Sequence, residues 1–256
     1  MRSYTFEEFV AIIRKLRAPD GCPWDREQTH QTLREAMLEE AYEAVESIDN
    51  EDMDNLREEL GDVLLQVVMH AVIAEEREDF TLSDVISEVA QKMVRRHPHV
   101  FGNLEVEDSK TVLKNWDEIK KQEHEETTTA ESMRRIAKAL PANIRAQKVQ
   151  RAATKTGFAF PNYEAAQSKV YEELNELKEA YETGDLSQIE EEYGDLLFSV
   201  VNLSGILQLN AENSLTNATN KFINRFEGVE RLASSKHQAL SDFTIDEMID
   251  LWKRIK

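Results

Sequence analysis

One pattern of acidic residues constrains this chain more than any other feature, because it occurs twice with the same spacing. Each copy contains two carboxylate pairs whose members lie three residues apart, so that on a helix they share one face. The eight positions are Glu40, Glu43, Glu59 and Asp62 in the first copy and Glu173, Glu176, Glu192 and Asp195 in the second. The offset between copies is identical at all four positions, as from 40 to 173 and from 62 to 195. Since surface acidity drifts freely in register, the fixed offset indicates duplication of one four-carboxylate site.

Helical wheels predict that the two pairs of one copy can meet. At 100° per residue, measured from an inward apolar residue of each helix, Glu40 lies at about 300° and Glu43 at about 240°, and Glu59 and Asp62 occupy the same two angles. Both pairs therefore flank the apolar stripe, which is expected to face the core and to include Ile48 in the earlier helix. Packing of the helices as an antiparallel hairpin would bring the four carboxylates together.

The composition favours an all-α protein of two repeats. Only 8 glycines and 5 prolines occur in 256 residues, and the Val/Ile/Thr alternation of strands is missing. Helices are expected at about 32–48, 82–96, 109–125, 142–156, 163–182, 187–210, 213–235 and 244–255. We expect a tandem repeat of two helical-bundle domains, at 1–126 and 141–256, joined by a linker at 127–140 that begins with a threonine run.

Other landmarks repeat at nearby offsets. Gly21 with Gly157 and Trp116 with Trp252 share one offset, and Lys92 with Lys221 and Arg96 with Arg225 share a slightly shorter one. Small insertions in loops account for the differences between offsets. The duplication therefore covers most of the chain.

The charge balance and the single cysteine exclude several classes of function. A net charge of −19 repels phosphate backbones and anionic lipids, which argues against nucleic-acid and membrane partners. Cys22 alone can form neither an intrachain disulfide nor a multi-cysteine zinc site. The amino-terminal segment does not resemble a secretory signal, and the apolar run at 63–74 is too short to cross a bilayer. We expect a soluble, cytoplasmic protein.

The clustered carboxylates predict a bound divalent cation. Like charges beside a core raise one another's pKa unless a cation lies between them. Carboxylate oxygens without Cys or His suit Mg²⁺ or Mn²⁺ better than Zn²⁺. A solvated acidic face is the competing interpretation, but it does not explain the second pair or the repetition. Whether one ion or two bind is left open.

A metal held in this way commonly meets substrate phosphates, which also need cations from the protein. Lys169, four residues before Glu173, and the pair Lys221 and Arg225 could supply them, or could merely pair with acidic neighbours. Ala36 stands where the first copy would have a lysine, so the first site looks less complete. Trp252 is a candidate to stack on a base, with core packing as the alternative.

These residues resemble a known family. The stretches Glu39-Glu40-x-x-Glu43 with Glu59-x-x-Asp62, and Glu172-Glu173-x-x-Glu176 with Glu192-x-x-Asp195, are similar to the signature of MazG-type nucleoside triphosphate pyrophosphohydrolases. Residues 21–25 and 95–101 are also similar to stretches of the two-repeat members. The resemblance implies an all-α NTP pyrophosphatase fold, Mg²⁺ dependence, homodimerisation, and hydrolysis of a broad range of (d)NTPs to NMP and diphosphate.

The resemblance also implies roles for individual residues. It marks all eight carboxylates as metal ligands and assigns catalysis mainly to the second repeat, through Glu173, Glu176, Glu192, Asp195, Lys221 and Arg225. The positions that it marks for nucleotide binding are Lys169, Val170, Tyr171, Glu172, Glu173, Glu190, Glu191, Lys221, Arg225 and Trp252. Because the first repeat keeps all its carboxylates, its activity is left open.

Four alternatives remain at this point. Spacing alone fits loss of the γ-phosphate as well as cleavage between the α- and β-phosphates, and one carboxylate could act as a base instead of a ligand. A di-iron carboxylate bundle would need E-x-x-H motifs that are missing beside these acids. A non-catalytic helical scaffold or regulator explains the amphipathic helices but leaves the repeated four-carboxylate pattern unexplained.

Overall fold

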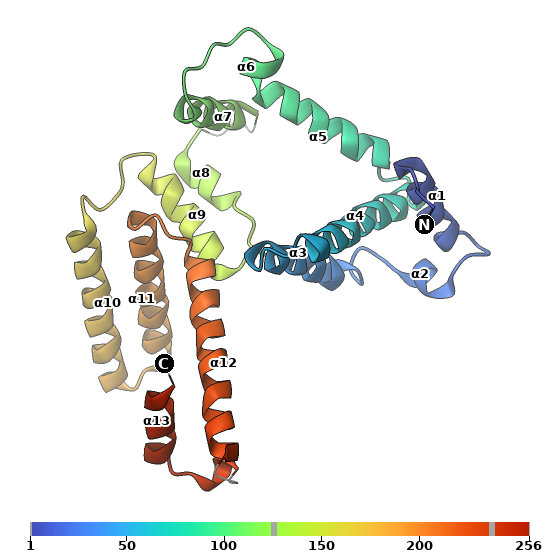
Figure 1. Ribbon diagram of the computed structural model, residues 1–256. Helices are drawn as coiled ribbons and strands as arrows, with labels where there is room; N and C mark the ends of the chain where they lie inside the picture. Colours follow the sequence, from blue (N-terminus) through green and yellow to red (C-terminus); the bar gives the residue numbers. More distant parts are fainter. Residues whose placement is uncertain (1, 124–126, 236–238, 256) are drawn as a thin grey trace. The chain divides into compact units, whose positions relative to one another are not determined.

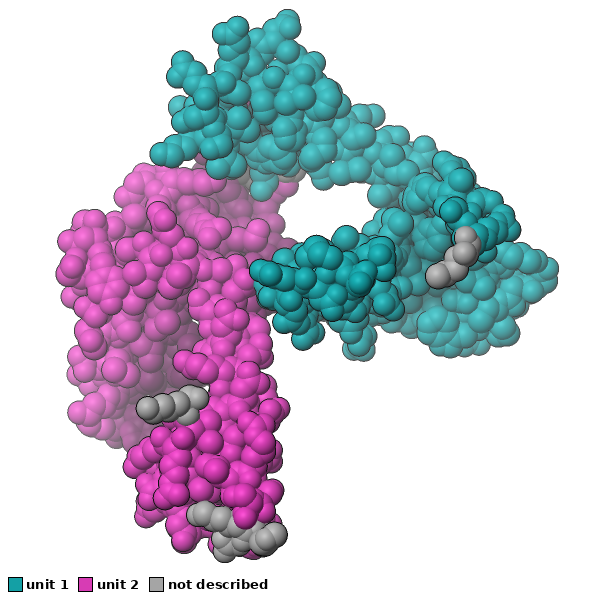
Figure 2. Space-filling model, in the orientation of Figure 1, with its two compact units in different colours: residues 1–120 teal, residues 121–256 magenta. Residues whose placement is uncertain are grey.

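The computed structural model describes residues 2–123, 127–235 and 239–255, and within these ranges the chain forms helices and no strands. The expected all-α class is therefore confirmed. The chain divides into two compact units, residues 1–120 and residues 121–256 (Figure 2), called unit 1 and unit 2 below. No helix in the described ranges has the length and apolar character needed to span a bilayer.

Unit 1 is organised around a helical hairpin. Its helices are α1 (Phe6–Arg17), α2 (Pro23–Glu27), α3 (Arg34–Asp49), α4 (Met53–Glu76), α5 (Leu82–Arg96), α6 (Pro98–Phe101) and α7 (Ser109–Glu123) (Figure 1). The core lies where α1 and α5 meet the carboxyl-terminal half of α4, around Ile13, Val68 and Val72. The end expected for α7, at residue 125, lies outside the described residues.

Unit 2 repeats the hairpin. Its helices are α8 (Thr129–Arg134), α9 (Ala142–Thr154), α10 (Tyr163–Thr183), α11 (Leu186–Ile206), α12 (Ala211–Ser235) and α13 (Ile245–Arg254), with a short 3₁₀ turn, η1 (Leu240–Asp242). Helix α9 packs against α11 and α12. A small core of Val229, Ala233 and Leu251 joins α12 to α13.

The two hairpins are built by the same local signals. Helices α3 and α4 lie side by side, as do α10 and α11 (Figure 1). Asp52 caps α4 by accepting a hydrogen bond from Asn55 N at 3.0 Å, and Asp185 caps α11 by accepting one from Ser187 N at 2.9 Å. The two caps are related by the same offset in the sequence as the carboxylates. The second helix of each hairpin, α4 or α11, therefore begins from an equivalent cap.

The segment 127–140, expected as a linker, contains helix α8. Thr128 is the N-cap, and its hydroxyl accepts a hydrogen bond from Glu131 N at 3.2 Å. The Glu131 carboxylate accepts in return from Thr128 N at 2.9 Å, which completes a capping box. The threonine run has the composition of a linker but starts a helix, because Glu131, three residues after Thr128, accepts hydrogen bonds from the exposed amide groups.

Ile48, expected in the core, and several other apolar side chains of the hairpins are exposed. Ile48 and Leu60 are each 55% exposed, and Tyr171 and Leu174 of α10 are 59% and 50% exposed. A two-helix hairpin buries only the face that meets its neighbours, so a second apolar face is left on the outside.

Candidate active site

The four predicted carboxylates of unit 2 converge around Glu173. Glu173 lies on α10, and Glu192 and Asp195 lie on α11, with one oxygen of each within 4.8 Å of the others. Glu176 belongs to an overlapping group, with Glu172 and Glu173, that meets the same distance limit. Glu173 is only 5% exposed, whereas Asp195 is exposed. The cluster therefore has one buried carboxylate at its centre and an open side.

Burial and like charge act on this cluster. Partial burial raises the pKa of Glu176, and the neighbouring charges of Glu173, Glu192 and Glu172 raise it further, while Lys169 acts in the opposite direction. The ionised form of Glu176 is therefore disfavoured until positive charge enters the cluster.

Lys169 stands at the edge of the cluster and is paired. Its Nζ lies 2.5 Å from Glu172 Oε1 and 2.6 Å from Glu173 Oε1, one turn along the same helix. The hydrogen bonds that it donates to Glu172 and Glu173 raise the pKa of Lys169 above its ordinary value. Lys169 therefore forms the ion pairs that one interpretation of the sequence expected. It also borders the candidate metal site, as the other interpretation, a phosphate-binding role, requires.

The remaining predicted nucleotide-binding residues of the hairpin are neighbours of these carboxylates in the chain. Val170 and Tyr171 follow Lys169 on α10, and the Tyr171 side chain is exposed. Glu190 and Glu191 precede Glu192 on α11 and are also exposed.

Unit 1 holds the equivalent cluster without a lysine. Oxygens of Glu40 on α3 and of Glu59 and Asp62 on α4 lie within 4.8 Å of one another. Burial raises the pKa of Glu59, and the charge of Glu43 and a hydrogen bond with its carboxyl group add to the effect. Burial also raises the pKa of Glu40, with added repulsion from Asp62 and Glu43. Within the described ranges no lysine or arginine pairs with these four carboxylates.

Gln66 belongs to the unit 1 cluster and was missed by sequence reasoning. It hydrogen-bonds to Glu40, and its Oε1 is buried without a hydrogen-bond partner among the described residues. It follows Asp62 by four residues on α4, so it lies one turn further along the same face. That spacing is the signal that could have identified it.

Lys221 and Arg225 of α12, predicted to bind phosphate, do not pair with the carboxylate cluster as Lys169 does. Arg225 Nε donates to the Ile255 carbonyl oxygen and Arg225 Nη2 to that of Trp252, both at 3.0 Å, and the guanidinium lies 4.4 Å from the centre of the Trp252 ring. Arg225 and Trp252, predicted to act together, are therefore in contact. Among the described residues, neither Lys221 nor Arg225 forms an ion pair with the unit 2 carboxylates.

The same arginine–tryptophan pair occurs in unit 1. The guanidinium of Arg96 lies 5.5 Å from the centre of the Trp116 ring. Arg96 and Trp116 correspond in sequence to Arg225 and Trp252, and in each unit the arginine lies over the tryptophan ring.

Comparison with known proteins identifies the family. The model of the MazG nucleotide pyrophosphohydrolase domain matches residues 28–101 and again residues 162–229, and each match contains one complete copy of the acidic pattern. The chain belongs to the MazG family. The two matches also agree with the duplication that the fixed offset indicates, and they include Lys221 and Arg225 in the second repeat.

Three curated relatives each match 98% or 99% of this chain. The chain is 44% identical to the nucleoside triphosphate pyrophosphohydrolase/pyrophosphatase MazG of Thermotoga maritima over 98% of this chain and 95% of that protein. It is 39% identical to the nucleoside triphosphate pyrophosphohydrolase of Escherichia coli K12 over 98% and 96%. It is also 43% identical to the uncharacterized protein YabN of Bacillus subtilis, over 99% of this chain and 52% of that one.

Proposed function

We propose that this MazG-family chain is a Mg²⁺-dependent nucleoside triphosphate pyrophosphohydrolase that converts a broad range of NTPs and dNTPs, with water, to the NMP and diphosphate. The observation that carries the proposal is the convergence of Glu173, Glu192 and Asp195 from two helices. The names of the full-length relatives from Thermotoga maritima and Escherichia coli support the same reaction.

The donor set fits Mg²⁺. The clusters offer carboxylate oxygens alone, within 4.8 Å of one another, and hard divalent cations prefer oxygen ligands. Their raised pKa values favour entry of a cation. Glu173, Glu176, Glu192 and Asp195 would hold Mg²⁺, or Mn²⁺, in unit 2, and Glu40, Glu43, Glu59 and Asp62 would hold it in unit 1. When bound, the ion supplies a Lewis acid that offsets phosphate charge and favours deprotonation of the attacking water.

The protein side chains supply orientation, charge and a proton acceptor. Lys169 is placed to exchange its contacts with Glu172 and Glu173 for phosphate oxygens. One of the four carboxylates could accept the proton of the water instead of acting as a ligand, and Glu176 is the candidate because it lies outside the group formed by Glu173, Glu192 and Asp195. The water oxygen bonds to the α-phosphorus, the bond to the bridging oxygen breaks, and diphosphate leaves with its electron pair.

Residues of α12 and α13 are proposed to bind the nucleotide. Arg225 stacks on Trp252 and presents positive charge beside an aromatic face, and Lys221 is exposed one turn earlier on α12. Substrate phosphates are the anions that such a pair would attract. These contacts complete the proposed nucleotide site of the second repeat, residues 141–256.

The second repeat is proposed to carry most of the activity. Lys169 borders its carboxylates, whereas Ala36 occupies the equivalent position in the repeat at 1–126. The phosphate-binding cation of the first repeat is therefore missing at that position, although its carboxylates are retained.

A second copy of the chain is the proposed cover for the exposed hairpin faces. Tyr171, Leu174 and Leu197 present apolar side chains to the outside in unit 2, and exposed apolar surface of this kind is typical of protein interfaces. We therefore propose a cytoplasmic homodimer that does not bind nucleic acid or membranes, because the net charge of −19 opposes both.

The reaction products test the proposal. Purified protein with Mg²⁺ and a mixed NTP pool should release diphosphate and NMP in equal amounts, and removal of divalent ions with a chelator should stop turnover. Orthophosphate as the sole product would contradict cleavage between the α- and β-phosphates. A scaffold without catalytic function would show no metal-dependent turnover that the substitution Glu192→Gln could abolish.

A further inference from the structure

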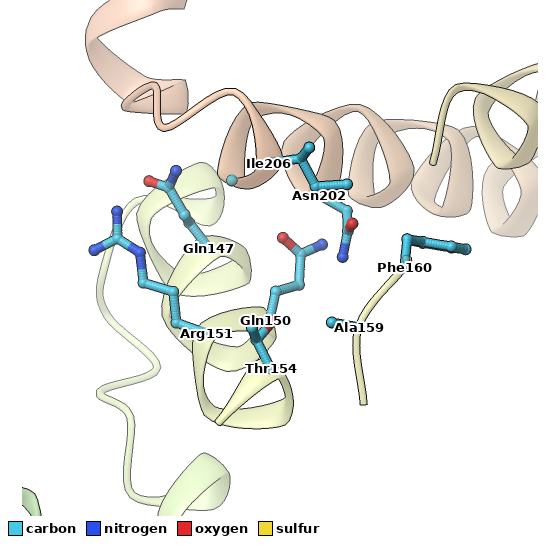
Figure 3. A pocket seen from close by; sticks show the side chains of 9 residues that line it. Gln147, Gln150, Arg151, Thr154, Ala159, Phe160, Asn202 and Ile206 are labelled. Atoms are coloured by element: carbon cyan, nitrogen blue, oxygen red, sulfur yellow. The ribbon is translucent and has the colours of Figure 1, made fainter. Parts of the chain in front are cut away.

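Gln66 of α4 differs from the two other buried glutamines of the described chain. Gln147 and Gln150 of α9, which are 6% and 8% exposed, donate from Nε2 to main-chain carbonyl oxygens at 2.7 Å. Figure 3 shows both beside a cavity between α9 and α11, where the Gln150 amide lies opposite Asn202. Gln66 is also only 6% exposed, but its Oε1 is enclosed and accepts no hydrogen bond from the described residues. An unpaired buried acceptor is costly, so this atom indicates a partner that the protein alone does not supply.

Gln66 lies against the unit 1 carboxylates. It follows Asp62 by four residues on α4, so both side chains leave the helix on the same face. Its amide donates a hydrogen bond to Glu40 of α3. Glu40 in turn has an oxygen within 4.8 Å of oxygens of Glu59 and Asp62. Because the enclosed oxygen belongs to the amide that contacts Glu40, it is held beside this carboxylate group.

An amide serves ionised carboxylates in two ways. Its nitrogen donates to a carboxylate, and its oxygen is a hard ligand of the kind that Mg²⁺ and Mn²⁺ accept beside carboxylates. The terminal torsion of a glutamine side chain is broad, so a partial turn of the amide costs little and lets Oε1 turn toward an ion held by Glu40. Gln66 is therefore suited to stabilise Glu40 before a cation binds and to bind the cation afterwards.

Unit 2 lacks this oxygen at the equivalent position. The offset that relates the two carboxylate patterns pairs Gln66 with Ser199. Ser199 is buried, and its hydroxyl donates to the Leu196 carbonyl oxygen at 2.8 Å within α11. The positive charge of unit 2 is the Lys169 ammonium, 2.6 Å from Glu173. A divalent ion that approaches Glu173 meets this like charge, whereas no lysine or arginine among the described residues pairs with the unit 1 carboxylates.

We propose that unit 1 binds its divalent cation without nucleotide, with Gln66 Oε1 as an oxygen ligand beside the carboxylates, whereas unit 2 takes up its cation together with phosphates that draw Lys169 away. The inference rests on the proposed binding of Mg²⁺ and deepens it by a further ligand and an order of loading. The cation of unit 1 then joins α3 to α4 whether or not substrate is present, so its role is to hold the hairpin. The competing explanation is that Gln66 only donates a hydrogen bond to Glu40.

Two substitutions of Gln66 separate these explanations. Gln66→Met keeps a long, unbranched side chain in the buried position but removes both the oxygen and the donor. Gln66→Glu keeps an oxygen that can bind a cation and removes the amide donor. A ligand role predicts that only the methionine weakens cation binding, whereas a donor role predicts that both substitutions weaken it. Ser199→Ala, at the equivalent position of unit 2, is the matched control.

Titration with Mn²⁺ in the absence of nucleotide measures the binding, with the paramagnetic resonance signal of the free ion as readout. Wild type should show a tight and a weak class of sites. Glu59→Gln should remove the tight class, and Glu192→Gln should leave it intact. Gln66→Met should raise the Kd of the tight class by about tenfold or more, which is typical for loss of a group that supports a metal site. Gln66→Glu should retain tight binding, and Ser199→Ala should change neither class.

A nucleotide that resists cleavage tests the order of loading. An NTP analogue with a methylene group between the α- and β-phosphorus should convert the weak class of wild type into a tight one and leave the first class unchanged. Lys169→Met should strengthen the weak class without nucleotide, because the competing positive charge is gone. An analogue that strengthens only the class removed by Glu59→Gln would contradict the proposed order.

Unfolding curves show whether each variant keeps its fold. Without nucleotide, Mn²⁺ should raise the melting temperature of wild type and of Gln66→Glu more than that of Gln66→Met. Equal Mn²⁺ affinity in wild type and Gln66→Met, or equal weakening by both substitutions, would refute the ligand role and leave metal-dependent hydrolysis intact. Loss of the tight class in Glu192→Gln but not in Glu59→Gln would overturn its assignment to unit 1. Absence of Mn²⁺ binding and of metal-dependent diphosphate release in wild type would instead refute the proposed function.

Discussion

The two acidic clusters share a backbone and differ in countercharge. In unit 2 the buried Glu173 has Lys169 at 2.6 Å, whereas in unit 1 the equivalent position of that lysine is Ala36 and Glu59 is hydrogen-bonded with another carboxyl group. Duplication therefore preserved the hairpin and its carboxylates, while the positive charge beside them diverged. The difference teaches that the carboxylate cluster and its countercharge can vary separately in this fold.

The largest expected effect is the difference in catalytic rate between variants of the two clusters. Glu192→Gln should lower the rate of diphosphate release by about 100-fold or more, because a metal that offsets phosphate charge contributes several kcal/mol to the transition state. The equivalent change in unit 1, Glu59→Gln, should reduce the rate by less than about twofold, since the first repeat is proposed to carry little activity. Initial rates with a coupled diphosphate assay provide the measurement. Equal losses in the two variants would abolish the functional distinction between the repeats.

A lysine exchange tests the countercharge directly. Lys169→Met should lower kcat/KM for NTPs by about tenfold, because a phosphate loses one charge-assisted hydrogen bond.

The reverse exchange places a lysine in the first repeat. Ala36→Lys should lower the pKa of Glu40 toward its ordinary value, and it should increase the residual activity of the Glu192→Gln variant. NMR titration of the Glu40 carboxyl carbon and turnover assays measure these two results. No change of either quantity in Ala36→Lys would show that the missing lysine does not explain the difference.

The arginine–tryptophan pair is closer in unit 2 than in unit 1, at 4.4 Å against 5.5 Å from guanidinium to ring. Arg225→Lys should destabilise the docking of α13 on α12 by about 1–2 kcal/mol, because the two carbonyl contacts and the stacking on Trp252 depend on the flat guanidinium. Amide hydrogen exchange in α13 should accelerate about tenfold. Arg231→Lys, whose exposed partner Glu227 lies 3.7 Å away, is the matched control and should leave exchange unchanged.

The smallest expected effect concerns pH and the metal-free protein. Since the folded-state pKa of Glu59 is raised above 4.5, its contribution to stability is complete below that value and is lost as pH rises through the folded pKa. The melting temperature of Glu59→Gln minus that of wild type should therefore increase between pH 4.5 and pH 7. The difference should shrink when Mg²⁺ is added.

The exposed neighbour supplies the control for this titration. Glu58→Gln changes the same type of side chain one position earlier on α4, where it faces solvent. Its melting temperature relative to wild type should stay constant over the same pH range. A pH-independent difference for Glu59→Gln would show that the unit 1 carboxylates do not repel one another in the metal-free fold.

The sequence predicted the carboxylate hairpins well, because their signals are local. Expected helices such as 82–96 and 163–182 agree with α5 (Leu82–Arg96) and α10 (Tyr163–Thr183), and the three-residue pairing placed Glu192 and Asp195 on one face. The linker expected at 127–140 contains α8. Composition alone suggested a linker, but the capping pair of Thr128 and Glu131 starts a helix there. Ile48, expected in the core, is exposed because a periodic stripe does not say how much of it one chain can cover.

Sequence by itself determined the helical class, the duplication and the carboxylate pairs, since periodicity and a fixed offset can be read along the chain without knowing what packs against what. Tertiary structure decided what those residues meet. It placed Arg225 on the carbonyl oxygens of Trp252 and Ile255, joined Gln66 to Glu40, and brought Gln150 of α9 opposite Asn202 of α11. Such contacts depend on how helices pack side by side, and side-chain spacing within one helix identifies the face that packs but not the individual side chains that this face meets.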